Sequence, residues 1–163
     1  MRVWWITLAS SYLLCLVAGM NAKTVYSNGH YTKKYNKFFS FMSVAILVLV
    51  AGLRSGIGDT PTYIQGYKTD APSTIAGSIK LLFSGKKDAG FYFYQGILKS
   101  IVNNPNVFIF VTSLITIVLI FITYYKYSQL LELSVFLFIT TGCYLVTMNG
   151  IRQYLQFYFF VFH

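Results

Sequence analysis

The sequence predicts an all-α fold, a polytopic bundle of transmembrane helices. Hydrophobic residues make up 56% of the 163 residues, whereas charged residues make up only 10%. A soluble domain carries about 25% charged residues, so this deficit indicates that lipid is the solvent for much of the chain. The mean hydropathy is +0.59, and the charges are gathered between long apolar runs. These observations predict an integral membrane protein.

Four apolar runs are suited to crossing a membrane, and a fifth begins near the end of the chain. We predict spans near residues 3–20, 38–53, 107–125 and 130–148, followed by an incomplete span at 151–163. A secretory signal peptide is the competing interpretation of the first run, but the paired Trp4 and Trp5 favour an interfacial belt. Because the last run is too short to cross a bilayer, we expect residues 1–163 to form a single transmembrane domain, the N-terminal part of a longer protein.

A long connector, residues 54–106, separates the second and third predicted spans. Its stretch from Tyr67 to Thr74 is predicted to be irregular. Further along, residues 91–102 have helical spacing, with Phe91, Tyr94, Leu98 and Ile101 on one face and Gln95 and Lys99 off that face. We therefore expect short helices in this connector, lying on the membrane surface or against the spans.

The chain is strongly basic, with a net charge of +9 and a pI near 9.6. Because the cations cluster between apolar runs, they favour anionic lipid headgroups or a phosphorylated substrate over nucleic acid. The two cysteines, Cys15 and Cys143, lie inside apolar runs and offer no zinc spacing. The sequence therefore predicts no metal site.

The lysines also predict an orientation. Residues 21–37 hold four lysines and no acid, and this density near the span ends favours a cytoplasmic location. Four crossings then place Arg54, Asp59 and Arg152 together on the outer face.

Two polar motifs stand at the ends of predicted spans. The first, RSGIGDTPTY at residues 54–63, follows the second span. Gly56 and Gly58 permit backbone angles that other residues resist, and Pro61 fixes a bend, so a tight loop is predicted. The second motif, MNGIRQ at residues 148–153, follows the fourth span. From the residues alone, both arginines can equally be anchors that mark helix ends at the headgroups.

Together with GFYFYQGILKSIVNNPN at residues 90–106, these motifs resemble the EpsG family of Wzy-like exopolysaccharide polymerases. The family pattern is an arginine, then GDT or GTD, then a tyrosine, with an IRQ-type triplet opening a later helix. The order and approximate spacing match across nearly the whole chain. The chain departs from the family in being shorter and in lacking a small residue soon after IRQ, where Tyr154, Leu155 and Gln156 stand.

The resemblance implies a multi-pass protein of the bacterial cytoplasmic membrane that polymerises exopolysaccharide or capsule repeat units, as in a biofilm. The implied reaction is glycosyl transfer from an undecaprenyl-pyrophosphate-linked oligosaccharide on the outer face, without a metal or another cofactor. The implied catalytic residues are Arg54, Asp59 and Arg152, and the implied substrate-binding residues are Tyr63, Asn149 and Gln153.

The residue types suit this chemistry. A pyrophosphate leaving group gains negative charge as the glycosidic bond breaks, and a guanidinium can hold its oxygens with two parallel hydrogen bonds. Asp59 can accept the proton of the attacking sugar hydroxyl, although a salt bridge to Arg54 or the capping of the loop is the commoner use of such a residue. Asn149 and Gln153 can donate hydrogen bonds to sugar hydroxyls.

Two other functions stay open. A lipid-linked sugar flippase or permease fragment would place charged residues deep within its spans. The first and third predicted spans have no charged residue, which favours a reaction site at the membrane surface. A non-catalytic membrane subunit could scaffold other polysaccharide-assembly proteins. If the chain is a fragment of a polymerase, we expect residues 1–163 alone to make no polymer.

Overall fold

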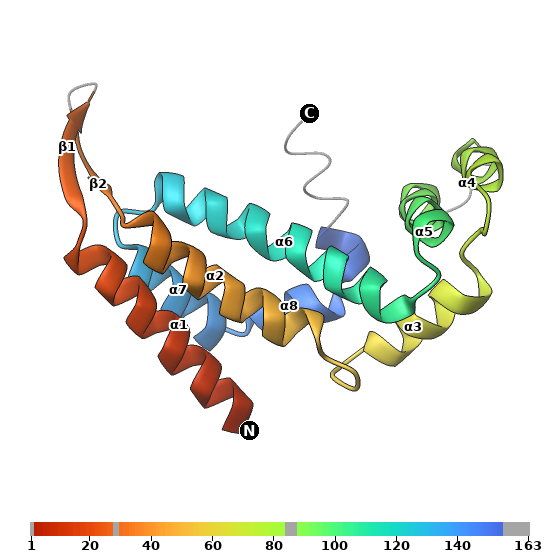
Figure 1. Cartoon of the computed structure of the whole chain (residues 1–163), viewed down its shortest axis with the longest axis horizontal. Coiled ribbons are helices and arrows are strands. Elements are labelled where there is room, and N and C mark those ends of the chain that lie inside the picture. The colour runs from red at the N-terminus through yellow and green to blue at the C-terminus, as the bar shows by residue number, and fades with distance from the viewer. Residues whose placement is uncertain (1, 28–29, 84–87, 155–163) are drawn as a thin grey trace. The chain divides into compact units, whose positions relative to one another are not determined.

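The computed structural model describes residues 2–27, 30–83 and 88–154, and for residues 27 and 30–32 only the backbone. The described residues form eight helices and two strands (Figure 1). They divide into two compact units, the first made of residues 1–50 and 117–145, and the second of residues 51–116 and those from 146 onward.

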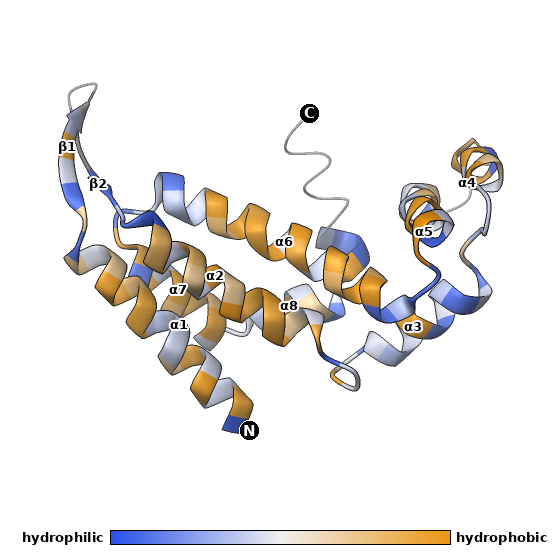
Figure 2. Cartoon of the chain, viewed as in Figure 1, coloured by the Kyte–Doolittle hydropathy of each residue, from blue (hydrophilic) through white to orange (hydrophobic). Residues whose placement is uncertain are grey.

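Most of the described chain is helical, as the sequence predicts. The helices are α1 (Arg2–Met20), α2 (Lys37–Gly52), α3 (Thr60–Thr69), α4 (Ile75–Leu82), α5 (Ala89–Ile101), α6 (Pro105–Tyr127), α7 (Leu131–Thr140) and α8 (Cys143–Asn149). The strands are β1 (Lys23–Ser27) and β2 (His30–Lys34). Hydrophobic residues dominate α2 and α6 (Figure 2).

In the first unit, α1 packs against α7 and is joined to α2 by small polar residues. The Cys15 thiol donates to Ser43 Oγ at 3.2 Å, and Ser43 Oγ donates to the Ser11 carbonyl at 3.1 Å. All three residues are fully buried. Small side chains let helix backbones approach closely, which is a common mode of helix association in membranes.

The stretch between the first two helices holds two paired strands, where the sequence predicted only a polar connector. Strands β1 and β2 pair antiparallel, with Lys23 opposite Lys34 and Val25 opposite Thr32. The sequence does carry a signal for this hairpin, because Asn-Gly, the dipeptide at positions 28 and 29, is favoured between two paired strands. The all-α prediction is therefore right except for these two short strands.

Within the described residues, two helices are long and apolar enough to cross a membrane. These are α1, with 19 residues, and α6, with 23. Helix α2 is apolar but has only 16 residues. The predicted span at 130–148 consists of α7 and α8, which are bent by 59° at a break where Gly142 has a φ of +81°. If this bent pair is one span, the described chain holds three, and the count of four crossings stays a prediction.

The second unit is built around an aromatic cluster. Its buried members come from α3 and the residues after it, from α5 and α6, and from the residues after α8: Tyr63, Tyr67, Ala71, Phe91, Phe108, Ile109 and Ile151. The rings of Tyr67 and Phe108 are stacked with centroids 4.7 Å apart, and the Tyr67 hydroxyl donates to the Val102 carbonyl at 2.9 Å. This cluster joins the connector to the start of α6.

Two expectations for the start of the connector are wrong. Tyr67 lies in α3, so the stretch predicted to be irregular is helical as far as Thr69. Pro61 occupies the first turn of α3 rather than fixing a bend. At that position its missing N–H costs no intrahelical hydrogen bond and its fixed φ suits the helix.

The predicted face of the next amphipathic helix is also partly wrong. Helix α5 forms where the spacing predicts it, and Phe91 is buried. However, Gln95 is only 2% exposed, whereas Ile101 is 72% exposed. The buried face therefore includes a polar residue that we placed off it, and the last apolar residue points away from the unit.

Candidate functional site

Arg54 lies in the second unit just after α2, and its guanidinium is buried. Nε donates to Thr60 Oγ1 at 2.8 Å, and Nη1 donates to the Ala51 carbonyl at 3.0 Å and to Ser113 Oγ at 3.3 Å. Nη2 donates to the Met148 carbonyl at 2.7 Å, across 94 residues of sequence. The side chain therefore joins the ends of α2 and α8 to α3 and α6.

These contacts explain how a positive charge is held with an exposure of only 7%. The Ala51 and Met148 carbonyls belong to the last turns of α2 and α8. Such terminal carbonyls lack partners within their own helix and carry the negative end of the helix dipole. Hydrogen bonds to charged groups contribute about 1.5–3 kcal/mol each, so Arg54 stabilises the meeting of the two motifs.

Gly58 brings the first motif directly against the second. Its φ of +58° is in the left-handed region that favours glycine. A Cβ atom at this position would lie 1.7 Å from Asn149 Oδ1, so no larger residue fits without a shift. Gly56, by contrast, has open space around it. The close approach therefore depends on only one of the two glycines.

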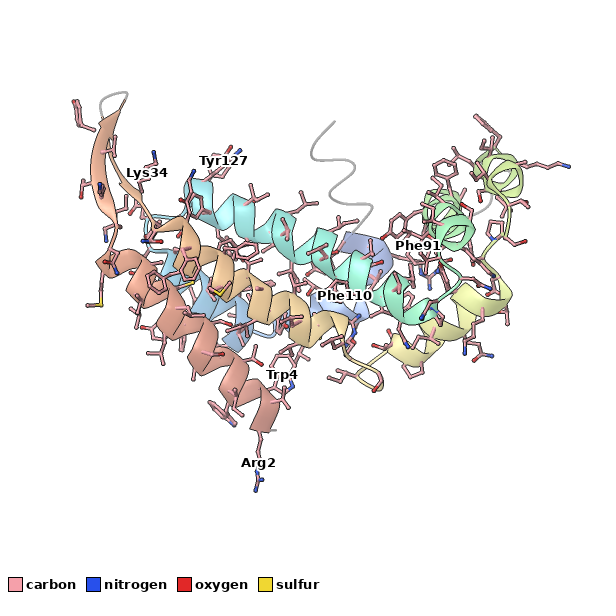
Figure 3. All side chains as sticks on the ribbon, in the orientation of Figure 1. Arg2, Trp4, Lys34, Phe91, Phe110 and Tyr127 are labelled. Atoms are coloured by element: carbon pink, nitrogen blue, oxygen red, sulfur yellow. The ribbon has the colours of Figure 1, made fainter. Side chains whose placement is uncertain are left out.

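Tyr63 connects α3 to the last residue of α8. Its hydroxyl donates to the Asn149 carbonyl at 2.9 Å, and its ring packs edge-on to Phe91 with centroids 6.2 Å apart. The Arg152 guanidinium carbon lies 5.9 Å from the centroid of the Tyr63 ring and 5.8 Å from that of Phe91. Figure 3 labels Phe91 on α5. Two aromatic rings thus support the second arginine, an arrangement typical of cation–π contacts.

Arg152 differs from Arg54 in being open to solvent. Its side chain is 44% exposed and forms an ion pair with Asp88, with Nη1 and Oδ2 2.9 Å apart. Burial acts to lower the pKa of the Arg152 guanidinium, but its contacts with Tyr63 and Asp88 raise the pKa overall. The group is therefore a permanent cation that faces outward from the unit.

Asp88 contacts the candidate site and was not predicted from the sequence. It precedes α5 with a φ of +64°, a left-handed conformation that aspartate tolerates better than most residues. Its carboxylate does not cap the helix and instead pairs with Arg152. The available signal was its rarity, since the chain has only four acidic residues.

The remaining predicted residues are less connected. Asp59 occupies the N-cap position of α3, where its side chain is exposed and makes no capping hydrogen bond. Gln153 is exposed as well. Within the described residues, no side-chain hydrogen bond links either of them to the arginines. The structure thus brings together Arg54, Tyr63, Asn149 and Arg152, and leaves Asp59 and Gln153 at the surface of the same unit.

An open groove of about 340 Å³ adjoins Arg54 in this unit. Its apolar wall comes from Leu53, Val107 and Phe110, the last of which is labelled in Figure 3. Gly52 allows the Phe110 ring to lie against the end of α2, because a Cβ there would be 2.5 Å from the ring. The sequence analysis did not predict this groove.

The described residues contain no group of three or more histidine, cysteine, aspartate or glutamate side chains that could hold a metal ion. What the unit does offer is a buried arginine, an exposed arginine on two aromatic rings, and an apolar groove. These features make up the candidate site.

The length and apolarity of these helices are those of a helical membrane protein. The chain belongs to the EpsG family, because the sequence profile of that family matches residues 37–162. The match includes every predicted site residue and also Asp88. The family is one of membrane polysaccharide polymerases, as the resemblance implied. No curated protein and no solved structure matches the chain significantly.

Proposed function

We propose that this protein polymerises repeat units of an exopolysaccharide or capsule by glycosyl transfer on the outer face of a bacterial cytoplasmic membrane. The donor would be an oligosaccharide linked to undecaprenyl pyrophosphate, and the acceptor would be a sugar hydroxyl of another lipid-linked chain. The site residues would be Arg54, Asp59 and Arg152, with Tyr63, Asn149 and Gln153 toward the sugars.

The observation that carries this proposal is the joining of the two arginine motifs. Arg54 donates to the Met148 carbonyl and Tyr63 donates to the Asn149 carbonyl, so two segments distant in sequence form one set. The exposed Arg152 lies at the edge of this group of contacts. A fixed cation beside apolar surface is what a lipid-linked pyrophosphate requires.

The reaction would proceed by substitution at the anomeric carbon of the donor sugar. The bond between that carbon and the phosphate oxygen breaks, and the electron pair leaves with the pyrophosphate. The acceptor hydroxyl oxygen forms the new glycosidic bond, and its proton passes to a base. The exposed carboxylate of Asp59, which caps no helix, is our candidate for that base.

The two arginines would have different tasks. Arg152 would bind the pyrophosphate oxygens directly, exchanging its ion pair with Asp88 for the substrate. Arg54, whose hydrogen bonds run to protein oxygens, would position the end of α8 that carries Arg152. The groove beside Arg54 would hold apolar atoms of the carrier lipid.

Reconstitution of the purified full protein in proteoliposomes tests this function. The vesicles would receive the lipid-linked oligosaccharide of the native host, and we expect longer chains with release of one undecaprenyl pyrophosphate per linkage. Movement of the substrate across the bilayer without elongation would indicate a flippase instead. Neither elongation nor movement, with elongation restored only by added host membrane proteins, would indicate a non-catalytic subunit.

A further inference from the structure

Helix α4 turns its apolar side chains outward. Ile75, Ile79 and Leu82 are 55%, 45% and 39% exposed, and Phe83, which follows the helix, is 83% exposed. Ser78 on the same helix is fully buried. At the helical rotation per residue, the four apolar residues fill an arc of about 100°. A helix on the surface of a water-soluble unit has the opposite arrangement.

This orientation is fixed by the packing of α4 on α5. A Cβ atom on Gly96 of α5 would lie 1.9 Å from Ser78 Oγ and 2.8 Å from Pro72. The contact therefore requires a glycine on one helix and a small residue on the other. Ser78 Oγ also donates to the Thr74 carbonyl at 3.0 Å, so its hydroxyl is satisfied. Rotating α4 to bury its isoleucines would destroy this contact.

We propose that the face formed by Ile75, Ile79, Leu82 and Phe83 lies in the interfacial region of the phospholipid bilayer. An exposed apolar face needs an apolar environment, and this chain is a membrane protein. A helix of eight residues is about 12 Å long, so it is too short to cross the bilayer and must lie in the plane of the interface.

Charge favours lipid over a protein as the occupant of this face. Lys80 is exposed and borders the apolar arc, where it can extend toward headgroups. Between Asp70 and Asp88 the sequence holds three lysines. Apolar residues on one side with lysines beside them are typical of helices that bind anionic membrane surfaces. This inference does not depend on the proposed polymerase reaction.

Tryptophan fluorescence in bilayers tests the proposal. Trp4 and Trp5 would be replaced by phenylalanine, and Phe83→Trp would report from the end of α4. The full protein would be reconstituted in nanodiscs whose acyl chains carry bromine either near the headgroup or near the chain end. Gln65→Trp, at an exposed polar position on α3 of the same unit, is the matched control.

We expect blue-shifted emission from Phe83→Trp and at least about twofold stronger quenching by the shallow bromines than by the deep ones, because interfacial helices lie near the headgroup boundary. The Gln65→Trp control should emit as a water-exposed indole. Water-exposed emission from Phe83→Trp would overturn the proposal. Blue-shifted emission without bromine quenching would also overturn it, since protein would then cover the face.

A second probe keeps the test valid if the tryptophan variant does not reach the membrane. A nitroxide on Ile79→Cys, with Cys15 and Cys143 replaced by alanine, should collide more readily with dissolved oxygen than with a water-soluble nickel chelate. The reverse preference would contradict insertion of this face.

Discussion

Arg54 and Arg152 place the same side chain in two environments. Arg54 is 7% exposed and donates to oxygens on four different segments. The Arg152 side chain is 44% exposed and pairs with Asp88 at the surface. Removing the partners of a buried charge strongly destabilises the folded protein, whereas removing the partner of an exposed charge does not. We therefore infer that Arg54 maintains the site and that Arg152 is the cation available to substrate.

Gly58→Ala should destabilise the protein, and Gly56→Ala should not. Alanine at position 58 would adopt a left-handed φ, at a cost of about 1–2 kcal/mol, and its Cβ would collide with Asn149. Alanine at position 56 meets nothing within 4 Å. Thermal unfolding of the two purified variants in the same detergent measures the difference. Equal midpoints would mean that the loop does not approach Asn149 as described.

Asp88→Asn should lower the KM for the lipid-linked donor, because Arg152 would no longer have to exchange an ion pair for pyrophosphate. Asparagine also tolerates the left-handed backbone of this position. Since exposed ion pairs contribute only about 0–1 kcal/mol, stability should hardly change. The control is Asp70→Asn, which removes an equal charge from an exposed residue of the same unit. An unchanged or higher KM for Asp88→Asn would show that Asp88 does not compete with substrate.

At the scale of elements, the aromatic cluster decides how the connector packs. Tyr67 is 1% exposed, stacks on Phe108 and donates to the Val102 carbonyl. Tyr67→Phe keeps the stacked ring and removes only the hydrogen bond, which should cost about 0.5–1.5 kcal/mol. Tyr67→Ala should cost about 3–5 kcal/mol because it also leaves a cavity.

Thermal unfolding measures both changes, with Tyr127→Phe as the control because Tyr127 is 81% exposed. If Tyr67→Phe and Tyr127→Phe unfolded at the same temperature, the hydroxyl of Tyr67 would have no structural role.

The sequence predicts the apolar helices well because lipid imposes one requirement on all of them. A long uncharged run must satisfy its backbone polar groups internally, so it becomes a helix. Helices α1, α2 and α6 therefore fall close to their predicted limits. The hairpin was not predicted, because the lysines of residues 21–37 give that stretch the composition of a polar connector.

The connector was harder to predict because tertiary contacts override local pattern there. Gln95 is buried although it is polar, and the face of α4 that packs on α5 is set by Ser78 and Gly96 rather than by its isoleucines. In the candidate site, the sequence predicted both arginine motifs. It did not predict the pairing of Arg152 with Asp88, because these residues are 64 positions apart and only the fold brings them together.

At the scale of the whole molecule, the distribution of lysines predicts the orientation in the membrane. Lys23, Lys33, Lys34 and Lys37 are exposed on the hairpin and at the start of α2, and no acidic residue occurs before Asp59. A high density of lysines close to the ends of membrane spans marks the cytoplasmic side. We therefore predict that the hairpin is cytoplasmic and that the connector between α2 and α6 is extracytoplasmic.

Single cysteines at exposed positions test this orientation after Cys15 and Cys143 are replaced by alanine. We expect a membrane-impermeant maleimide to label Thr69→Cys in intact cells and to label Lys33→Cys only after permeabilisation. The reverse pattern would invert the protein and place the arginine site on the cytoplasmic side.

The central claim is that Arg152 contacts the pyrophosphate while Arg54 holds the site together, and parallel lysine substitutions test it most directly. Polymer produced per molecule of membrane-inserted full protein would be measured in a polymerase-deficient host, alongside the thermal midpoint of each purified variant. Arg2→Lys, which changes the only other arginine of the chain, is the control.

We predict that Arg152→Lys keeps its abundance and its thermal midpoint but makes at least about tenfold less polymer. Lysine loses the paired hydrogen bonds of a guanidinium to phosphate, and about 1.4 kcal/mol corresponds to one decade in rate. Arg54→Lys should instead lower the thermal midpoint. Normal polymer from Arg152→Lys at normal abundance would contradict the account and leave this arginine as an anchor at the membrane surface.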